Sequence, residues 1–378
     1  MKRRLRTMTL ALLITAIGLT LGVHLILGQP KFGKLPEGEH QKRLQASPNY
    51  REGTFRNTVP TTMLAEGQST AKILWKSLWA DKNRTWPQKP LPSSKLDLAA
   101  LDTAKNVVIW LGHFSYFIQL GGKRILMDPV FNDHAAPFSW FNNNFPGTDL
   151  YRAADMPEMD FLLISHDHWD HLDHQTAVGL MPKVKAVVSP LGVGAHFTHW
   201  GYPREKVLEA DWNTALHFEN GFAIHIVPAR HFSGRLLTRN KTQWAGFVLE
   251  TPAHRIFLSG DTGYGPHIAE IAKAFGSFDL VALDGGQYDA RWPQIHMTPE
   301  EAALAARELN AKKLLLAHVG RFCISAHPWD EPFIRAVEAS RDMPFRLVTP
   351  KIGEPLWLDG TEQTFSHWWR TASLSWGK

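Results

Sequence analysis

The stretch SHDHWDHLDHQT, residues 165–176, contains four histidines and three aspartates within twelve residues. It directly follows the apolar run FLLI, residues 161–164, which predicts a buried strand that ends where the polar groups begin. Groups that bind protons and metal ions therefore gather at the carboxyl end of a strand. This is where α/β proteins commonly place their site residues.

The spacing within this stretch, H-x-H-x-D-H, favours a metal site. Side chains two positions apart point the same way as the chain leaves a strand, so His166 and His168 can converge on one ion. Asp170 and His171 lie beyond the turn and can face a second ion. Imidazole and carboxylate ligands suit Zn²⁺ or a neighbouring transition metal. The alternative is a histidine-rich surface loop that binds metal adventitiously.

Three more potential ligands each follow an apolar strand run. His231 comes after IHIV, Asp261 after RIFL and His318 after LLLA. Taken singly, each histidine could be a hydrogen-bonded core residue, and Asp261 in GDTG could be a turn aspartate. Their shared position after a strand predicts that they meet the histidine-rich stretch at one sheet edge.

Short β-rich apolar runs alternate with turns and helical patterns from residue 106 onward. This alternation predicts a layered α/β (α+β) fold. The runs are 107–111, 116–120, 124–127, 161–164, 186–188, 222–227, 246–250, 255–258, 280–283, 314–317 and 345–348. One helix start is clear, because Thr298 supplies an N-cap, Pro299 the first helical position and Glu301 a capping-box carboxylate.

Residues 8–27 read MTLALLITAIGLTLGVHLIL, about the twenty residues that cross a bilayer core. We expect residues 1–28 to form an uncleaved single-pass signal anchor, with a cleaved signal peptide as the alternative. The basic residues Lys2 to Arg6 should stay in the cytoplasm. The rest of the chain would then lie on the extracytoplasmic, periplasmic side of a bacterial inner membrane.

Residues 29–105 are polar and rich in proline, with a helix-compatible patch near residues 71–78. We expect this segment to pack on the main domain, residues 106–378, with a disordered stalk as the alternative. Lys2, Arg3, Arg4 and Arg6 supply four of the five net positive charges of the chain, so the remainder carries +1. This balance does not indicate a nucleic-acid-binding surface. The single cysteine, Cys323, excludes an intramolecular disulfide.

The full pattern resembles the metal-ligand signature of the metallo-β-lactamase fold superfamily. It is most similar to the branch that contains N-acyl-phosphatidylethanolamine phospholipase D and related bacterial hydrolases. The resemblance covers residues 47–357. It rests on the segments WLGHFSYFIQLGGKRILMDPVF (110–131), PARHFSGR (228–235), SGDTGYGP (259–266), RWPQIHMTPEEA (291–302), SPNY and TVPT.

The resemblance implies an αββα sandwich that holds two Zn²⁺ ions at one edge. His166, His168 and His231 would hold the first ion. Asp170, His171 and His318 would hold the second, with Asp261 bridging both. It also implies that His296 lies beside the substrate, and we expect Asp170, Asp261 and His296 to act in catalysis.

Other residues are candidates for supporting roles. Asp128 could accept the free N–H of a metal-bound histidine, or be a plain turn aspartate. His113 is expected near the site without binding metal. Arg235 and Arg291 could pair with a phosphate, although ordinary ion-paired arginine is the default. His174 is expected to cap or pack in the helix that follows His171.

The function predicted from these features is a membrane-anchored phosphodiesterase of phospholipase D type that acts on N-acyl-phosphatidylethanolamine or a related glycerophospholipid. A zinc-dependent lactonase or other acyl-ester or amide hydrolase is the first alternative, because the same ions serve a carbonyl. A non-catalytic metal-binding envelope protein is the second. The sequence leaves the exact substrate, the native metal and the oligomeric state open.

Overall fold

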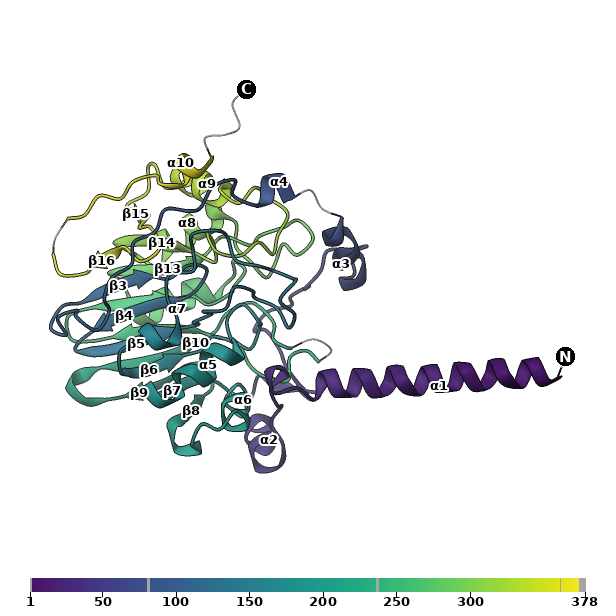
Figure 1. Ribbon diagram of the computed structural model, residues 1–378. Helices are drawn as coiled ribbons and strands as arrows, with labels where there is room; N and C mark the ends of the chain where they lie inside the picture. The colour runs from purple at the N-terminus through teal and green to yellow at the C-terminus, as the bar shows by residue number, and fades with distance from the viewer. Residues whose placement is uncertain (1, 80–81, 236–237, 361, 374–378) are drawn as a thin grey trace, which may run out of the picture.

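The computed structural model describes residues 2–79, 82–235, 238–360 and 362–373. Two seven-stranded sheets pack face to face and helices cover their outer faces, so the chain forms an αββα sandwich (Figure 1). The layered α/β fold predicted from the sequence is confirmed.

The first sheet runs from an antiparallel half into a parallel half. The pairs from β16 to β5 are antiparallel and those from β5 to β8 are parallel. Its strands, in spatial order, are β16 (Pro355–Trp357), β3 (Val107–Trp110), β4 (Tyr116–Leu120), β5 (Lys123–Met127), β6 (Met159–Leu163), β7 (Val184–Pro190) and β8 (Val207–Ala210).

The second sheet repeats this plan. The pairs from β9 to β12 are antiparallel and those from β12 to β15 are parallel. Its strands, in spatial order, are β9 (Thr214–His217), β10 (Ala223–Val227), β11 (Gly246–Glu250), β12 (Arg255–Leu258), β13 (Leu280–Asp284), β14 (Lys313–Ala317) and β15 (Arg346–Val348).

Strand β3 shows why the sheets stack. Val108 and Trp110 pack in the core between the sheets, whereas Val107 and Ile109 pack in the layer under the outer helices. Successive residues of a strand face opposite sides, so a strand that is apolar throughout is buried on both faces. The helices outside the sheets are α5 (His174–Leu180), α6 (Gly194–His199), α7 (His267–Phe275), α8 (Pro299–Glu308), α9 (Glu331–Ala339) and α10 (Trp369–Ser373).

Each apolar run named above overlaps a strand, but three strands of the large sheets were missed. These are β8, β9 and β16, each at the end of a sheet. An edge strand is buried less completely and therefore shows a weaker apolar pattern. Helix α8 begins as predicted, with Thr298 and Glu301 forming a reciprocal capping box.

The N-terminal segment carries helices α1 (Lys2–Leu27), α2 (Gly38–Gln45), α3 (Thr70–Leu78) and α4 (Lys82–Thr85), the turn η1 (Pro30–Phe32) and the hairpin β1 (Tyr50–Arg51) and β2 (Thr54–Phe55). Helix α1 stands away from the body in Figure 1 and is long and apolar enough to cross a membrane over Arg4–Leu27. Its Thr9, Thr15 and Thr20 hydroxyls donate to backbone carbonyls one turn earlier. These hydroxyls would therefore need no hydrogen bond to water inside a bilayer.

Residues between η1 and β3 contact the sandwich at several places. The Trp200 indole donates to the Pro30 carbonyl at 2.7 Å, and the Leu91 amide donates to the Pro146 carbonyl at 2.8 Å. The Asn57 side chain donates to the His231 carbonyl at 2.8 Å. This last contact places part of the segment beside a predicted metal ligand.

Candidate metal centre

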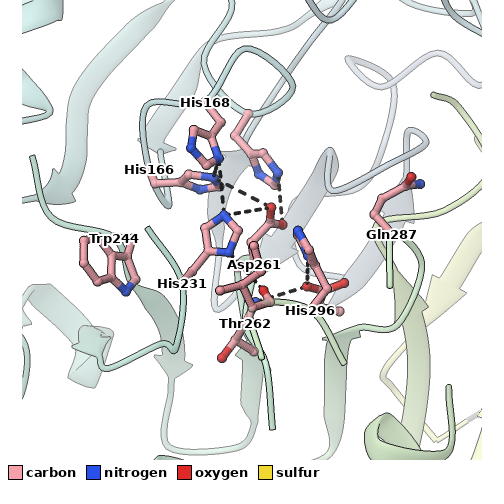
Figure 2. Close-up of polar contacts among 12 residues, drawn as sticks. His166, His168, His231, Trp244, Asp261, Thr262, Gln287 and His296 are labelled. Carbon is pink, nitrogen blue, oxygen red and sulfur yellow. Dashed lines mark hydrogen bonds and ion pairs between the residues drawn. The ribbon is translucent and has the colours of Figure 1, made fainter. Parts of the chain in front are cut away.

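The polar residues singled out in the sequence meet where the loops after β6, β10, β12 and β14 converge. Figure 2 shows His166, His168 and His231 pointing toward one another, with Asp261 beside them. Each of these side chains is buried or nearly so. The two sheets thus deliver side chains from distant parts of the chain to one place.

The first group consists of His166, His168, His231 and Asp261. Nδ1 of His168 lies 2.8 Å from Nε2 of His166 and 3.2 Å from Nε2 of His231. Oδ2 of Asp261 lies 3.7 Å from Nε2 of His166 and 3.5 Å from Nε2 of His231. Three imidazoles and one carboxylate oxygen therefore face a common point.

The second group consists of Asp170, His171 and His318, together with His113. Oδ2 of Asp170 lies 3.5 Å from Nε2 of His171 and 3.1 Å from Nε2 of His318. Oδ1 of Asp261 lies 3.0 Å from Nε2 of His171. The two oxygens of Asp261 thus face different groups, which is the geometry of a bridging carboxylate.

Asp128 orients two of these histidines. Its Oδ2 accepts a hydrogen bond from Nδ1 of His171 at 2.8 Å and another from the Ser165 hydroxyl at 2.5 Å. The Ser165 oxygen lies 2.9 Å from Nδ1 of His166, from which it accepts. Both imidazoles therefore carry hydrogen on Nδ1, so Nε2 is the nitrogen of each that faces the centre.

The histidines from the second sheet are oriented in the same way. Nδ1 of His231 donates to the Ile295 carbonyl at 2.9 Å, and Nδ1 of His318 lies 3.2 Å from Oδ1 of Asp284. The other oxygen of Asp284 accepts from Nδ1 of His296 at 2.7 Å. Asp284 thus links a predicted metal ligand to the predicted substrate contact.

This donor arrangement fits a bound cation. Burial lowers the pKa of His166 and His231 well below the ordinary value, so both are neutral with lone pairs on Nε2. Nδ1 of His168 carries at most one hydrogen, so at most one of its two short contacts is a hydrogen bond. A positive ion among the three nitrogens would satisfy every lone pair.

The second group also needs positive charge. Burial opposes a charged imidazole, but the carboxylates of Asp261 and Asp170 outweigh burial and raise the pKa of His171 well above its usual value. Asp261 and Asp284 similarly raise the pKa of His318 to about 10. Protons on these histidines would be exchanged for a metal ion, because a ligating imidazole must be neutral.

The carboxylates remain ionised. Burial favours their neutral form, but the neighbouring histidines, His171 first, hold the pKa of Asp170 and Asp261 well below the usual range. Oδ1 of Asp261 and Nε2 of His171 are buried without a hydrogen-bond partner among the residues that the structure describes. They face each other at 3.0 Å, where a cation between them would bind both.

Three non-glycine residues at the centre have a left-handed backbone: His113, Asp128 and His318, with φ of 56°, 41° and 65°. Non-glycine residues rarely adopt this conformation, and its strain collects at functional sites. Backbone hydrogen bonds hold His113 against His318. The His113 amide donates to the Val319 carbonyl at 2.9 Å, and the His318 amide donates to the His113 carbonyl at 3.1 Å. Nε2 of His113 then reaches Oδ2 of Asp170 at 2.8 Å.

Sequence reasoning missed Asp167, which lies between two of the predicted ligands. Its carboxylate accepts from the Gly234 amide at 2.7 Å, the Thr242 hydroxyl at 2.8 Å and Nε2 of His196 at 3.2 Å. These donors come from the loop after β10 and from α6. Asp167 therefore ties the histidine-rich loop to the loop that carries His231.

Sequence reasoning also missed Asp284, the last residue of β13. It follows the run LVAL just as Asp261 and His318 follow theirs, so the signal was present. The next residues are Gly285 and Gly286, and a Cβ on Gly286 would lie 1.9 Å from the His318 carbonyl oxygen. Glycine at this position lets the β13 and β14 loops approach closely.

The structure gives both candidate arginines partners within the protein. Arg235 donates to the carbonyls of Asp167 at 2.9 Å and Leu172 at 2.8 Å, and its guanidinium lies 3.8 Å from the centre of the Trp169 ring. Arg291 pairs with Asp289 at 2.7 Å. His174 is the first residue of α5, whose N-cap is Asp173.

Comparison with known proteins identifies the family of the domain that carries these residues. The family model of the beta-lactamase superfamily domain matches residues 123–319, which contain all seven predicted metal ligands. An uncharacterised protein from Mycobacterium tuberculosis (strain ATCC 25618 / H37Rv) is 36% identical over 331 residues, covering 86% of this chain and 88% of its own length.

Two further relatives have informative names. N-acyl-phosphatidylethanolamine-hydrolyzing phospholipase D 1 from Caenorhabditis elegans is 32% identical over 231 residues, covering 56% of this chain and 63% of the relative. Outer membrane protein RomA from Klebsiella pneumoniae is 52% identical over 98 residues, covering 26% of this chain and 74% of the relative.

Among solved structures, the metallo hydrolase Igni18 from Ignicoccus hospitalis superposes with a TM-score of 0.52 at 19% identity, covering 67% of this chain and 98% of the other. This match supports the fold. Together with the family model and the relative matched over most of its length, it confirms the resemblance read from the sequence. The chain therefore belongs to the beta-lactamase superfamily, the metal-dependent hydrolases of the metallo-β-lactamase fold.

Proposed function

We propose that the protein is a membrane-anchored, dinuclear zinc hydrolase that cleaves a phosphodiester bond of N-acyl-phosphatidylethanolamine or a related glycerophospholipid, on the phospholipase D side. The products would be phosphatidate and the headgroup alcohol. The observation that carries the proposal is the pair of ligand groups that share Asp261, one facing each of its oxygens.

The donor set favours zinc. The seven predicted ligands are five imidazoles and two carboxylates, which are of intermediate softness, and cysteine is absent from both groups. Two zinc ions, when bound, would supply a hydroxide at neutral pH and stabilise the charge on the phosphoryl oxygens. The protein's own residues would orient these ligands and exclude water, since nearly all of the side chains involved are buried.

His296 is the residue we propose to meet the substrate. Its Nδ1 hydrogen is held by Asp284 at 2.7 Å, so Nε2 is the ring nitrogen left to face a phosphate oxygen or the leaving group. The ring lies 4.9 Å from the His231 ring and 5.0 Å from the His318 ring, between the two ligand groups. Asp284 would keep the tautomer and direction of this imidazole fixed.

The phospholipid substrate is supported by the relative from Caenorhabditis elegans and by α1. A bilayer-spanning α1 would leave its basic N-terminal end in the cytoplasm and hold the body against the outer surface of the inner membrane. The relative from Klebsiella pneumoniae is named an outer membrane protein, which also associates this group of chains with the cell envelope.

The test is to incubate the full-length protein in mixed lipid–detergent micelles with N-acyl-phosphatidylethanolamine, phosphatidylcholine and an acyl lactone, with and without zinc. We expect zinc-dependent release of phosphatidate from the first lipid, detected by mass spectrometry, and its loss in His168→Ala. Turnover of the lactone alone would replace this proposal with the acyl hydrolase. One tightly held zinc ion without hydrolysis would replace it with the non-catalytic envelope protein.

A further inference from the structure

Large apolar side chains are exposed at few places outside α1. In the described part of the chain they are Trp75, Trp79, Trp140, Val178 and Ile334. The three tryptophans are 65%, 74% and 71% exposed, although a tryptophan normally buries most of its surface. Single exposed apolar residues need no explanation, but a group of exposed tryptophans calls for a partner.

Helix α3 presents two of these tryptophans on a basic face. Lys72, Trp75, Lys76 and Trp79 follow the i, i+3, i+4, i+7 spacing, so they share one side of the helix, and all four are exposed. The two indole rings lie 6.0 Å apart. Helix α3 contains no acidic residue. Tryptophan favours the headgroup layer of a membrane, and lysine favours anionic lipid phosphates.

This basic tryptophan face lies near the base of the anchor helix. The loop after His231 contacts both, since Arg235 donates to the Lys31 carbonyl at 2.9 Å and Arg239 donates to the Thr70 hydroxyl at 2.9 Å. Lys31 is four residues past the end of α1, and Thr70 is the first residue of α3. Figure 1 shows α1 and α3 standing out on the same side of the body.

The third exposed tryptophan is tied to the same base. The Lys31 ammonium lies 5.0 Å from the centre of the Phe138 ring, and Phe138 stacks on Trp140 with ring centres 5.6 Å apart. The segment of Trp140 therefore contacts Lys31 directly, and α3 contacts the same loop whose Arg235 holds Lys31. They would reach the headgroup layer together if α1 entered the bilayer.

We infer that the basic tryptophan face of α3, with Trp140 beside it, docks on the headgroup layer of the bilayer that α1 enters, and that its partner is anionic phospholipid. The inference rests on the proposed insertion of α1 and not on the bond that the centre cleaves. The Arg239 guanidinium lies 5.4 Å from the Phe232 ring centre, and that ring contacts the His168 ring at 4.4 Å. Docking would therefore hold the metal-binding loops beside the lipid surface.

The experiment uses full-length Cys323→Ser protein in vesicles of phosphatidylcholine and phosphatidylglycerol, with one new cysteine labelled by a fluorophore. Ala71→Cys reports on α3 without removing a residue of its basic tryptophan face, and Ile17→Cys reports on α1. Glu158→Cys is the control. Residue 158 comes just before β6, at the end of this strand opposite the metal centre. Nitroxides placed on the lipid headgroup or deep on the acyl chain quench the fluorescence according to depth.

We expect headgroup nitroxides to quench the label at residue 71, acyl-chain nitroxides to quench the label at residue 17, and neither to quench the label at residue 158. Trp75→Ser with Trp79→Ser should reduce quenching at residue 71 to the level at residue 158, whereas the exposed Ile334→Ser should leave it unchanged. Lys72→Gln with Lys76→Gln should remove the dependence of the quenching at residue 71 on phosphatidylglycerol.

The outcomes separate the inference from the proposal beneath it. Quenching at residue 17 with none at residue 71 would overturn the docking of α3 and leave the anchor intact. Absence of quenching at residue 17 would overturn the insertion of α1 and the docking with it. Quenching at residue 71 that is equal in pure phosphatidylcholine would overturn the choice of anionic lipid as partner.

Discussion

The two sheets contribute to the metal centre in different ways. The first sheet supplies His166, His168, Asp170 and His171 from one loop after β6. The second supplies His231, Asp261 and His318 from separate loops, after β10, β12 and β14. A compact motif fixes the spacing of its ligands locally, whereas scattered ligands depend on the register of the whole sheet.

This difference indicates which residues the assembly of the centre depends on most. The first sheet's loop has a local scaffold in Asp128 and Ser165, which orient two of its histidines. Its fit against the second sheet depends on Asp261, which faces both ligand groups, and on Asp167, which holds the loops together. Substitutions of Asp261 or Asp167 should therefore reduce metal affinity, turnover or stability more than substitutions of residues that contact the ligands of one sheet only.

The largest effect is expected for Asp261→Ala. Because this carboxylate faces both groups, its loss should lower the affinity for both ions and raise the activation barrier by several kcal/mol, which is roughly 10³-fold or more in turnover. Metal analysis by mass spectrometry and a turnover assay would measure both. The control is Asp279→Asn, a surface aspartate that pairs with Lys312 at 2.8 Å. A variant that retains both ions would disprove the bridging role.

Asp167→Ala should destabilise the fold by about 3–5 kcal/mol, because it leaves buried donors on Gly234 and Thr242 without their carboxylate. The midpoint of thermal unfolding, measured with zinc chelated, should fall by several degrees or more. Asp173→Ala in the same stretch removes the N-cap of α5 and a half-buried hydrogen bond from Asn132 at 2.8 Å, and should cost about 1–2 kcal/mol. Equal losses in the two variants would contradict the joining role of Asp167.

Asp128→Asn and Asp284→Asn compare the carboxylates that orient the histidines of the first and of the second sheet. Each variant is expected to lose about 10–100-fold in metal affinity. Asp128 supports a proposed ligand of each ion, His166 through Ser165 and His171 directly. Asp284 supports only His318 among the ligands. Competition with a chromogenic chelator should therefore show both binding steps weakened in the first variant and one in the second. The same pattern in both variants would refute the assignment.

The smallest effect is expected for Asn57→Ala. Asn57 brackets the backbone of His231, donating to its carbonyl at 2.8 Å and accepting from its amide at 3.1 Å. Its Oδ1 also accepts from the Trp244 indole at 3.2 Å, and loss of these three hydrogen bonds should cost about 1–2 kcal/mol in stability and a few-fold in affinity for the first ion. Arg56→Ala, an exposed neighbour paired with Glu52, is the control and should change neither quantity.

The convergence of these residues was largely predictable because the proposed ligands follow simple rules of chain geometry. The H-x-H-x-D-H spacing is contiguous, and His231, Asp261 and His318 each come within four residues after an apolar run. The expected placement of His113 near the metal ligands agrees with its 2.8 Å contact to Asp170. The interior strands were predicted because strands buried on both faces are apolar throughout.

The residues that escaped prediction act through partners far away in the chain. Asp167 looked like one more polar residue of the motif, yet its donors are Thr242, Gly234 and His196. Asp284 follows an apolar run as the predicted ligands do, but its contact with His318 is formed only in the folded chain. From the sequence alone, Arg235 could equally bind a phosphate, whereas in the structure its guanidinium donates to backbone carbonyls.

The sequence by itself determined the α/β class, the apolar N-terminal helix and the ligand types that suit zinc, because periodicity and side-chain chemistry are local properties. Only the tertiary structure decided which nitrogen of each histidine faces the centre, which residues join the loops of the two sheets, and which loops sit beside the base of α1. These depend on hydrogen bonds and packing between the two sheets, and the local patterns that place residues at one sheet edge do not specify which donor there meets which acceptor.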